Sequence, residues 1–297
     1  MTIPELVTPF RLYWDPVADL AVQPNFAGIC REIVALKFLA VDVTDSGSTF
    51  SSVSRQILDY LAGAPLRLTV TVSGQAFSGM SRERSDLSGC AMLLVQARSL
   101  TELSSITADM DRYRNDRQIG ISWQMHEATA SDLPEVVASC AKHGIKQLVI
   151  PMQRLACGTA PFILEQAALT QLAGKLAEIP SLAGVSATIH DPFLWRAFHN
   201  DTPFPEGRCQ AANTMLYLAA DGRVYPCPEM PVDLGSVLNE SLSMIVKGEK
   251  RQKVRQRIRE LPAGCHCCSV AVACFGGCRG RGLVATGGWD GADPGCR

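Results

Sequence analysis

The sequence predicts an α/β protein in which helices cover a parallel β-sheet and a small cysteine-rich α+β segment follows. Short apolar runs alternate with longer amphipathic stretches through residues 1–200, which is the periodicity of strands and helices taken in turn. The strand runs are almost continuously apolar, as strands buried on both faces of a parallel sheet are. Cysteines crowd into the last third of the chain. Periodicity alone leaves open whether the sheet is open or curls into a barrel.

Six short apolar runs are the predicted strands, because each has the length of a strand rather than of a helix. A seventh short run, Gly184–Ile189, is a further candidate. The six predicted strands are Arg11–Trp14, Leu36–Val43, Leu66–Val72, Ala91–Gln96, Gly120–Met125 and Lys146–Met152.

Amphipathic helices are predicted between these strands, and their ends carry recognisable signals. Ser99 and Glu102 have the spacing of a capping box. Ser131 is a predicted N-cap and Gly144 a C-terminal stop for one helix. The predicted helices are Ser51–Leu61, Ser99–Asn115, Ser131–His143 and Ala160–Glu178.

Composition restricts the class of protein. The chain has 297 residues, 47% of them hydrophobic and 19% charged, so it can bury a sizeable core. A net charge of −1 argues against a general nucleic-acid binder. No segment approaches the roughly 20 apolar residues of a membrane-spanning helix, and residues 1–7 lack the basic start of a signal peptide. We therefore expect a cytoplasmic protein, in which clustered cysteines bind metal more often than they form disulfides.

Seven cysteines follow one spacing, which reads C-x12-G-x4-C, then C-x2-C-x5-C-x3-C, then a final cysteine. Thiolates grouped in this way bind metal ions or iron–sulfur clusters. Structural zinc is the alternative, because four-cysteine zinc sites also use C-x2-C turns. His266 and Cys267 would then be spare ligands, whereas the spacing is complete without Cys267. Gly222 lies in Ala220-Asp221-Gly222, which predicts a hairpin turn before Cys227.

This spacing resembles the SPASM domain, the auxiliary-cluster module of many radical SAM enzymes that modify peptides and proteins, over residues 205–297. The resemblance implies two 4Fe-4S clusters. It also implies that residues 1–200 form a partial (β/α)6 TIM-like barrel of the radical SAM type, because this module usually follows such a barrel. By resemblance, the first cluster would be held by Cys209, Cys227 and Cys278 and the second by Cys265, Cys268, Cys274 and Cys296.

The first cluster would have one iron without a cysteine ligand. Many family members supply an eighth cysteine between the first two, but residues 210–226 contain none. That stretch offers Asn213, Thr214, Tyr217 and Asp221 instead. We expect the fourth position to be open to solvent or a partner, or to be capped by a weak oxygen ligand.

The chain departs from radical SAM enzymes at the catalytic centre. Such enzymes carry C-x3-C-x2-C in the loop after the first strand, and here residues 15–24 contain no cysteine. Cys30 stands alone on the predicted following helix, and a single thiolate does not hold a cluster. Residues 44–48 are at best an eroded form of the family's glycine-rich cofactor turn. The barrel is thus degenerate, and S-adenosylmethionine (SAM) is not an expected cofactor.

A narrower resemblance fits this departure. The Arg11-Leu-Tyr-Trp-Asp15 start and the seven-cysteine tail resemble the SPASM-domain protein of GeoRSP peptide-modification systems. That resemblance implies an iron–sulfur accessory protein that partners a radical SAM/SPASM enzyme and a precursor peptide, either relaying electrons or binding substrate. Two alternatives remain: a zinc-stabilised peptide-binding module, and an enzyme that uses an open-site cluster without cleaving SAM.

The remaining chemistry-bearing residues are predicted to be structural. Isolated cysteines are usually core residues, although Cys157, after the sixth strand, could face the tail. The basic run from Lys247 to Arg259 is interpreted as a solvated helix face. The alternative is that it docks an acidic peptide or a partner enzyme, or raises the potential of nearby clusters. Polar residues at the strand ends could line a relict pocket, but no pair has an acid–base spacing, so none is assigned a catalytic role. The isolated cysteines are Cys30, Cys90, Cys140 and Cys157, and the strand-end residues are Asp42, Asp45, Ser73, Gln96, Arg98, Gln124, His126, Glu127, Gln153, Arg154, His190 and Asp191.

Overall fold

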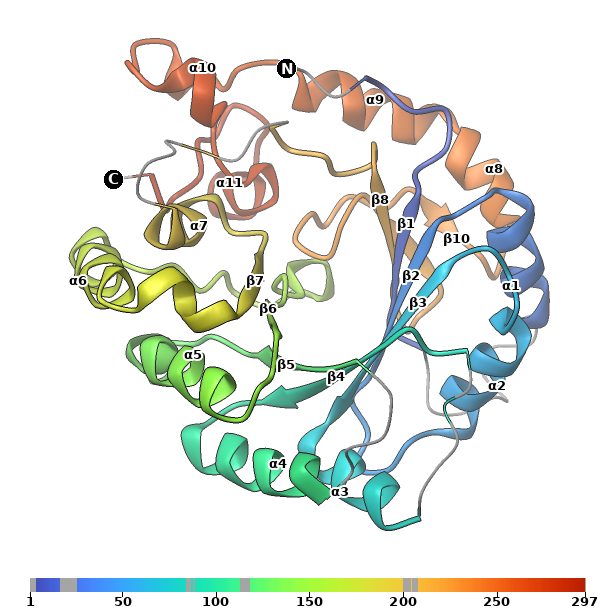
Figure 1. Cartoon of the computed structure of the whole chain (residues 1–297). Coiled ribbons are helices and arrows are strands. Elements are labelled where there is room, and N and C mark those ends of the chain that lie inside the picture. The colour runs from blue at the N-terminus through green and yellow to red at the C-terminus, as the bar shows by residue number, and fades with distance from the viewer. Residues whose placement is uncertain are drawn as a thin grey trace.

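The computed structural model describes residues 4–16, 26–83, 87, 89–112, 118–199, 204 and 208–296. Its centre is a ten-stranded sheet in the order β10-β9-β8-β1-β2-β3-β4-β5-β6-β7. Neighbouring strands from β1 to β7 pair in parallel. Helices lie on the outside of this curved sheet (Figure 1), so the predicted α/β class is confirmed.

The strands and helices alternate through the first two hundred residues, as the sequence predicts. The strands are β1 (Arg11–Trp14), β2 (Ala40–Asp45), β3 (Arg67–Ser73), β4 (Met92–Ala97), β5 (Ile119–Trp123), β6 (Gln147–Ile150), β7 (Ser186–Ile189), β8 (Met215–Leu218), β9 (Arg223–Tyr225) and β10 (Gly235–Ser236). The α-helices are α1 (Phe26–Ala35), α2 (Ser52–Leu61), α3 (Gly74–Glu83), α4 (Leu100–Arg112), α5 (Leu133–Lys142), α6 (Gln166–Ala177), α7 (Pro192–Phe198), α8 (Leu242–Lys247), α9 (Glu249–Ile258), α10 (Ala271–Cys274) and α11 (Arg279–Thr286). The short 3-10 helices are η2 (Ala130–Asp132), η3 (Leu155–Cys157), η4 (Pro180–Gly184) and η5 (Ala263–Cys265).

The core lies between the sheet and its outer helices. Strand residues such as Val41, Val70 and Val95 are completely buried, and α2 turns Ile57 and Leu61 toward them. Burying an aliphatic side chain of this size contributes about 1.5–3 kcal/mol. The strands are apolar along their whole length because both faces of the parallel sheet are buried. The same continuous apolar runs are the basis on which the sequence predicts an α/β protein.

The sheet is a partial barrel. It curves from β1 round to β7, and in the described residues β7 has only β6 as a hydrogen-bonded neighbour. On the other side of β1 the cysteine-rich segment adds strands to the same sheet: β8 pairs in parallel with β1, aligning Tyr217 with Tyr13. The two segments thus share one sheet.

The predicted hairpin before Cys227 is confirmed. β8 and β9 pair antiparallel, and Gly222 between them has φ of +80°, a conformation that glycine adopts without steric cost. The side chain of Asp221 accepts a hydrogen bond from the Arg223 N–H at 3.0 Å, which tightens the turn.

Several boundaries differ from the sequence prediction for identifiable reasons. The helix predicted from Ala160 begins only at Gln166, because the Gln153 side chain pairs with the backbone N–H and C=O of Phe162, at 2.6 and 2.8 Å. Ser131 is not an N-cap; it lies within η2, and α5 starts two residues later.

Two further elements, β2 and α4, can be compared with their predicted boundaries. β2 starts at Ala40 rather than at Leu36, since Leu36 still bonds back to Glu32 at the end of α1. Half of the capping box at α4 forms: the Glu102 N–H donates to Ser99 Oγ at 3.1 Å, whereas the Glu102 carboxylate accepts the N–H of Arg98, at 2.7 Å, rather than that of Ser99. The predicted end of that helix, residues 113–115, lies outside the described residues. None of the described helices is long and apolar enough to cross a membrane.

Candidate functional site

Three of the seven cysteines meet where the tail folds against the open mouth of the barrel. Cys209 precedes β8, Cys227 follows β9, and Cys278 is the N-cap of α11. Cys227 is buried, and Cys209 and Cys278 are half-buried. Their thiols interact electrostatically, Cys209 with Cys227 and Cys227 with Cys278. The structure therefore brings these three together, although they span 70 positions of the sequence.

The other four cysteines form a second group in the last 33 residues. Cys265 ends η5 and Cys274 ends α10. Cys265 interacts with both Cys268 and Cys296, and Cys274 interacts with Cys265 and Cys296. Cys265 is buried, whereas Cys268 and Cys296 are exposed, so this group faces solvent on one side.

A sharp turn joins the two groups. Between Cys274 and Cys278 the chain passes through Phe275, Gly276 and Gly277, whose φ angles are +52°, +86° and +66°. A Cβ on Gly277 would lie 2.6 Å from the Asp293 Cβ. Two adjacent glycines therefore let one short segment carry ligands to both groups.

Burial dominates the electrostatics of the first group. It raises the pKa of Cys209 and raises the pKa values of Cys227 and Cys278 well above the ordinary thiol value, with the nearby Glu229 carboxylate acting in the same direction on the latter two. Backbone N–H groups of Glu229 and Met230 that bond to the Cys227 sulfur oppose this rise. These N–H groups favour the thiolate, which is the form that binds metal.

In the second group burial and mutual repulsion both act. Burial raises the pKa of Cys274 to about 11, and the neighbouring thiol of Cys296 contributes. The same two causes raise the pKa of Cys265. Thiolates that repel one another in this way are stabilised when a cation binds among them.

Buried arginines surround the first group, and this corrects one sequence interpretation. The basic run was interpreted as a solvated helix face, yet Arg251 and Arg255 of α9 are only 6% and 8% exposed. Arg255 donates to the backbone carbonyls of Cys209 and Ala211, at 3.0 and 2.9 Å, and forms an ion pair with Glu5 at 2.6 Å. Arg257, in contrast, is on the exposed face. The helix thus fixes the backbone at Cys209.

Arg281 of α11 links the barrel to the tail. It is 1% exposed and forms ion pairs with Asp191, at the N-cap of α7, and with Asp293, the latter at 2.7 Å. Asp293 also accepts the Cys278 N–H at 2.6 Å, and its carbonyl accepts the Cys296 N–H at 2.9 Å. Asp293 therefore positions a cysteine of each group, Cys278 through its carboxylate and Cys296 through its backbone carbonyl.

A cavity of about 210 Å³ lies among the first group of thiols. Glu229 lines it and is 6% exposed. Its Oε2 lies 3.0 Å from the Cys278 sulfur, and its Oε1 accepts the Gln153 N–H at 3.2 Å. Burial raises the pKa of Glu229, an effect that Arg281 partly offsets. The cavity is lined by Met152, Ile189, His190, Pro192, Phe204, Arg208, Cys209, Gln210, Ala211, Met215, Cys227, Glu229, Ala273, Cys274, Gly277, Cys278 and Gly280.

These residues fit an iron–sulfur cofactor. Within each group neighbouring thiols interact in pairs, backbone N–H groups face sulfur, and nearby arginines balance the charge. In the described part of the chain, no three histidine, cysteine, aspartate or glutamate side chains converge on a site for a single metal ion. That finding concerns single ions, whereas in a four-iron cluster the thiolates bind different iron atoms.

The isolated cysteines lie mostly in the core. Cys30 and Cys140 are 2% and 0% exposed, as predicted. Cys90 is half-buried and bonds to the Met92 carbonyl at 3.0 Å. Cys157 is exposed, in η3, and its sulfur is 3.5 Å from the Tyr217 hydroxyl. Cys267 is exposed as well.

The polar residues at the strand ends chiefly support the fold. Asp45 accepts the N–H groups of Gly47 and Ser51, and Ser73 donates to the Gly47 carbonyl. Gln96 bonds to Gln124. These contacts favour the structural interpretation over a relict catalytic pocket.

An ion pair crosses the mouth of the barrel at the end of β1. Arg154 donates to both carboxylate oxygens of Asp15, at 2.7 and 3.0 Å, and to Thr44 Oγ1 at 3.1 Å. Tyr217 donates to the same carboxylate at 2.8 Å. Asp15 begins the segment that carries the cysteine triad in radical SAM enzymes, most of which, residues 17–25, lies outside the described residues.

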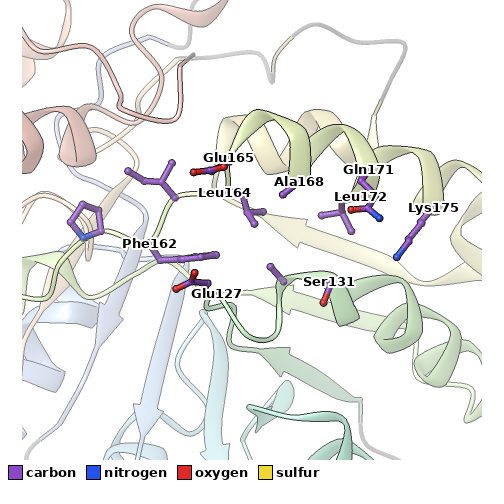
Figure 2. Close-up of a pocket in the computed structure, with 12 residues that line it drawn as sticks. Glu127, Ser131, Phe162, Leu164, Glu165, Ala168, Gln171, Leu172 and Lys175 are labelled. Carbon is purple, nitrogen blue, oxygen red and sulfur yellow. The ribbon is translucent and has the colours of Figure 1, made fainter.

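A larger cavity, of about 540 Å³, lies on the outer layer between α6 and the start of α5. Figure 2 shows Leu164, Ala168 and Leu172 on one side and Glu127 and Ser131 on the other, with Phe162 at one end. Its lining contains no cysteine. It is therefore a separate feature from the two thiol groups.

Sequence reasoning missed Glu229, Arg281 and Asp293. The only sequence signals were their positions, since Glu229 lies two residues after Cys227 and Asp293 three before Cys296. Charged residues in such a tail are ordinarily exposed. Their burial becomes evident only once the chain is folded.

The described structure is a partial α/β barrel whose C-terminal segment gathers two groups of thiols. Residues 209–269 match the profile of the SPASM family, described as an iron–sulfur cluster-binding domain. This matched range is shorter than the predicted 205–297. No curated protein sequence matches the chain.

Solved radical SAM/SPASM proteins share the fold. Streptococcus suis SuiB bound to S-adenosylmethionine superposes with a TM-score of 0.70 at 13% identity, over 99% of this chain and 78% of SuiB. SuiB bound to its precursor peptide SuiA gives 0.69 at 13% identity, over 99% and 77%. The anSMEcpe enzyme with bound AdoMet and the Cp18Cys peptide gives 0.60 at 12% identity, over 97% and 94%. The chain therefore carries a SPASM domain on a radical SAM/SPASM fold.

Proposed function

We propose that this protein is an iron–sulfur accessory protein that binds two 4Fe-4S clusters and partners a radical SAM peptide-maturation enzyme. The observation that supports this most strongly is the division of seven thiols into two interacting groups. The first is Cys209, Cys227 and Cys278, and the second is Cys265, Cys268, Cys274 and Cys296. Each group has the thiolate-rich donor set of an iron–sulfur cluster.

In this proposal the charged residues around the thiols position the cysteine backbones and balance the thiolate charge. Arg255 and Asp293 fix the backbones of Cys209 and Cys278. Arg279 and Arg281 place positive charge beside thiolates that would otherwise repel one another. When bound, the clusters would supply one-electron transfer and, at an iron without a thiolate, a site for an exchangeable ligand.

Electron relay is favoured by the closeness of the two groups. Cys274 belongs to the second group by its thiol interactions, yet it also lines the cavity of the first. The exposed Cys268 and Cys296 put the second group at the surface. Electrons would therefore enter or leave through the second cluster and reach the first, which is the more deeply buried.

The sequence after β1 supports the proposed accessory role. Residues 15–25 contain no cysteine, so the chain offers no C-x3-C-x2-C triad there for a cluster that cleaves SAM. SuiB and anSMEcpe were each solved with SAM and with a peptide. A precursor peptide is accordingly the proposed substrate, and a complete radical SAM/SPASM enzyme is the proposed partner.

Metal analysis after anaerobic purification tests the proposal. The expected result is about eight iron atoms per chain with an equal amount of acid-labile sulfide and a brown colour. Stoichiometric zinc without sulfide would instead establish the zinc-stabilised peptide-binding module.

A further inference from the structure

The first group of thiols leaves one iron of a four-iron cluster without a cysteine ligand. Three cysteines bind three of four irons, and residues 210–226 supply no fourth thiol. Three of the four oxygen-bearing candidates there are engaged elsewhere, and the fourth, Thr214, does not line the cavity. Tyr217 donates to Asp15, the Asn213 amide bonds to Pro4, Leu6 and Gln210, and Asp221 is exposed in the hairpin turn.

Neither spare thiol reaches the cavity. Cys157 and Cys267 are both exposed, and neither lines the space among Cys209, Cys227 and Cys278. Several other side chains with donor atoms line it. Cys274 belongs to the second group, the Gln210 amide oxygen accepts from Asn213 at 2.8 Å, and Met152 and Met215 offer only weak thioether donors, which leaves Glu229 and His190. The fourth ligand from this chain is therefore to be sought between these two.

Contacts favour Glu229. Its Oε2 accepts a hydrogen bond from the Cys278 thiol at 3.0 Å, which places the carboxylate beside a candidate cluster ligand, and its charge also acts on the thiols of both Cys227 and Cys278. His190 instead directs Nε2 toward the Tyr13 hydroxyl, at 3.3 Å. Glu229 is also held in place, because the turn Cys227–Met230 closes with a backbone bond of 3.2 Å and the Gln153 N–H holds Oε1.

We infer that the Glu229 carboxylate is the fourth ligand of the first cluster, and that it is an exchangeable one. This inference rests on the proposed function, since it presupposes a cluster at the first group. An oxygen donor binds a thiophilic iron less firmly than sulfur does. A thiol or another soft anion therefore displaces Glu229 more readily than it displaces any of the three cysteines.

The surroundings give an incoming ligand a place beside Glu229. A small cavity of about 60 Å³ shares Glu229 and Met152 with the thiol cavity. The same small cavity shares Phe162 and Leu164 with the larger groove shown in Figure 2. Glu229 thus stands between the thiol cavity and the small cavity, which in turn borders the larger cavity of the outer layer. A cysteine-containing peptide is the chemical class of ligand that this arrangement suits.

The test uses full-length protein reconstituted anaerobically with ⁵⁷Fe and compares the wild type with Glu229→Ala, Glu229→Gln, Glu229→Cys and His190→Gln. Wild-type protein is expected to show one iron distinct from the thiolate-bound irons in its Mössbauer spectrum. It is also expected to show an electron paramagnetic resonance signal that shifts as 2-mercaptoethanol is added. In Glu229→Ala the thiol concentration for half-maximal shift should fall about tenfold, because no carboxylate competes.

The substitutions separate ligation from mere proximity. Glu229→Cys should make the distinct iron resemble the others and abolish the response to thiol. The isosteric Glu229→Gln should resemble Glu229→Ala, and His190→Gln should leave the wild-type response intact. The second cluster's unchanged signal in every variant reports correct folding.

Three outcomes would overturn the inference. An identical thiol titration in wild type and Glu229→Ala would show that the carboxylate is only a neighbour of Cys278. A shift caused by His190→Gln alone would assign the position to His190. Wild-type protein without iron and sulfide would refute the two-cluster function itself, and the Glu229 assignment with it, whereas the first two outcomes leave that function standing.

Discussion

At the scale of single residues, two carboxylates at the barrel mouth have opposite effects on stability. Asp15 is satisfied by Arg154 and Tyr217. Asp42 is half-buried, but its Oδ2 is shielded from solvent and has no hydrogen-bond partner among the described atoms, and its ion pair with Arg11 is long, at 3.7 Å. Burial consequently raises the pKa of Asp42, although Arg11 and Thr69 oppose the rise.

We expect Asp42→Asn to raise the free energy of unfolding at pH 7. A carboxyl whose pKa is higher in the folded state binds more protons folded than unfolded, so stability falls as pH rises from the unfolded value, about 3.9, through the folded one. The variant should lack this part of the pH dependence. Urea unfolding at several pH values measures it, and a lower stability of the variant at pH 7 would show that the Arg11 pair outweighs burial.

Asp15→Asn is the matched comparison at the same mouth. It removes a bidentate partner of Arg154 and should lower the free energy of unfolding by about 2 kcal/mol, the range for charged hydrogen bonds. The same urea titration measures the loss. An effect within 0.5 kcal/mol, roughly that of an ordinary surface substitution, would contradict the role given to this pair.

At the scale of elements, α9 carries two kinds of arginine. Arg255 bonds to Glu5 and to the carbonyls of Cys209 and Ala211, whereas Arg257 pairs with Glu260 at the surface. Arg255→Gln should cost about 2–3 kcal/mol, since it leaves buried carbonyls unpaired. It should also speed loss of iron from the first cluster under chelator. Arg257→Gln is the control, expected to change stability by less than about 0.5 kcal/mol, and equal effects of the two would be inconsistent with the buried face.

Helix α11 depends on a close approach at Gly280. A Cβ there would lie 2.1 Å from the Glu229 carbonyl oxygen, whereas one on Gly288 would meet nothing within 4 Å. Gly280→Ala should therefore push α11 away from the Cys227–Met230 turn, at a cost of about 1–3 kcal/mol, and lower the iron content of the first site. Gly288→Ala should retain wild-type iron and melting temperature. Full iron content in Gly280→Ala would mean that this contact is not needed.

Elements of the barrel could be predicted well because their signal is local. Val41, Val70 and Val95 are buried, and each lies in an apolar run of the sequence that predicts a buried strand without knowledge of the rest of the fold. Boundaries were less predictable where a distant side chain decides them, as Gln153 does for the start of α6. Helix α3 and helix α7 were not predicted.

At the scale of the whole molecule, the cysteine spacing predicted how the seven thiols divide into two groups but not which residues surround them. Glu229 forms a hydrogen bond with Cys278, which is 49 residues away in the sequence, and Arg281 forms one with Asp191, which is 90 residues away. No local pattern encodes such contacts. The burial of two arginines in the basic run was unpredictable for the same reason. The backbone carbonyls that accept hydrogen bonds from Arg251 and Arg255 belong to residues far away in the sequence.

The whole chain is expected not to cleave SAM. Incubation of the reduced, iron-loaded protein with SAM should give no 5′-deoxyadenosine beyond that of a protein-free control, because residues 15–25 hold no cysteine for the necessary cluster. Chromatography of the reaction measures the product. Catalytic formation of 5′-deoxyadenosine would reveal another ligand set in the barrel and would make the protein an enzyme in its own right.

The central claim is that seven cysteines form two separate cluster sites, and selective removal tests it most directly. Iron and sulfide should be counted in wild type, in Cys265→Ala/Cys268→Ala and in Cys209→Ala/Cys227→Ala, all prepared anaerobically. The account predicts about eight irons in wild type and about four in each double variant, with a different paramagnetic signal surviving in each. Loss of all iron in both variants, or the same surviving signal in both, would contradict two independent sites.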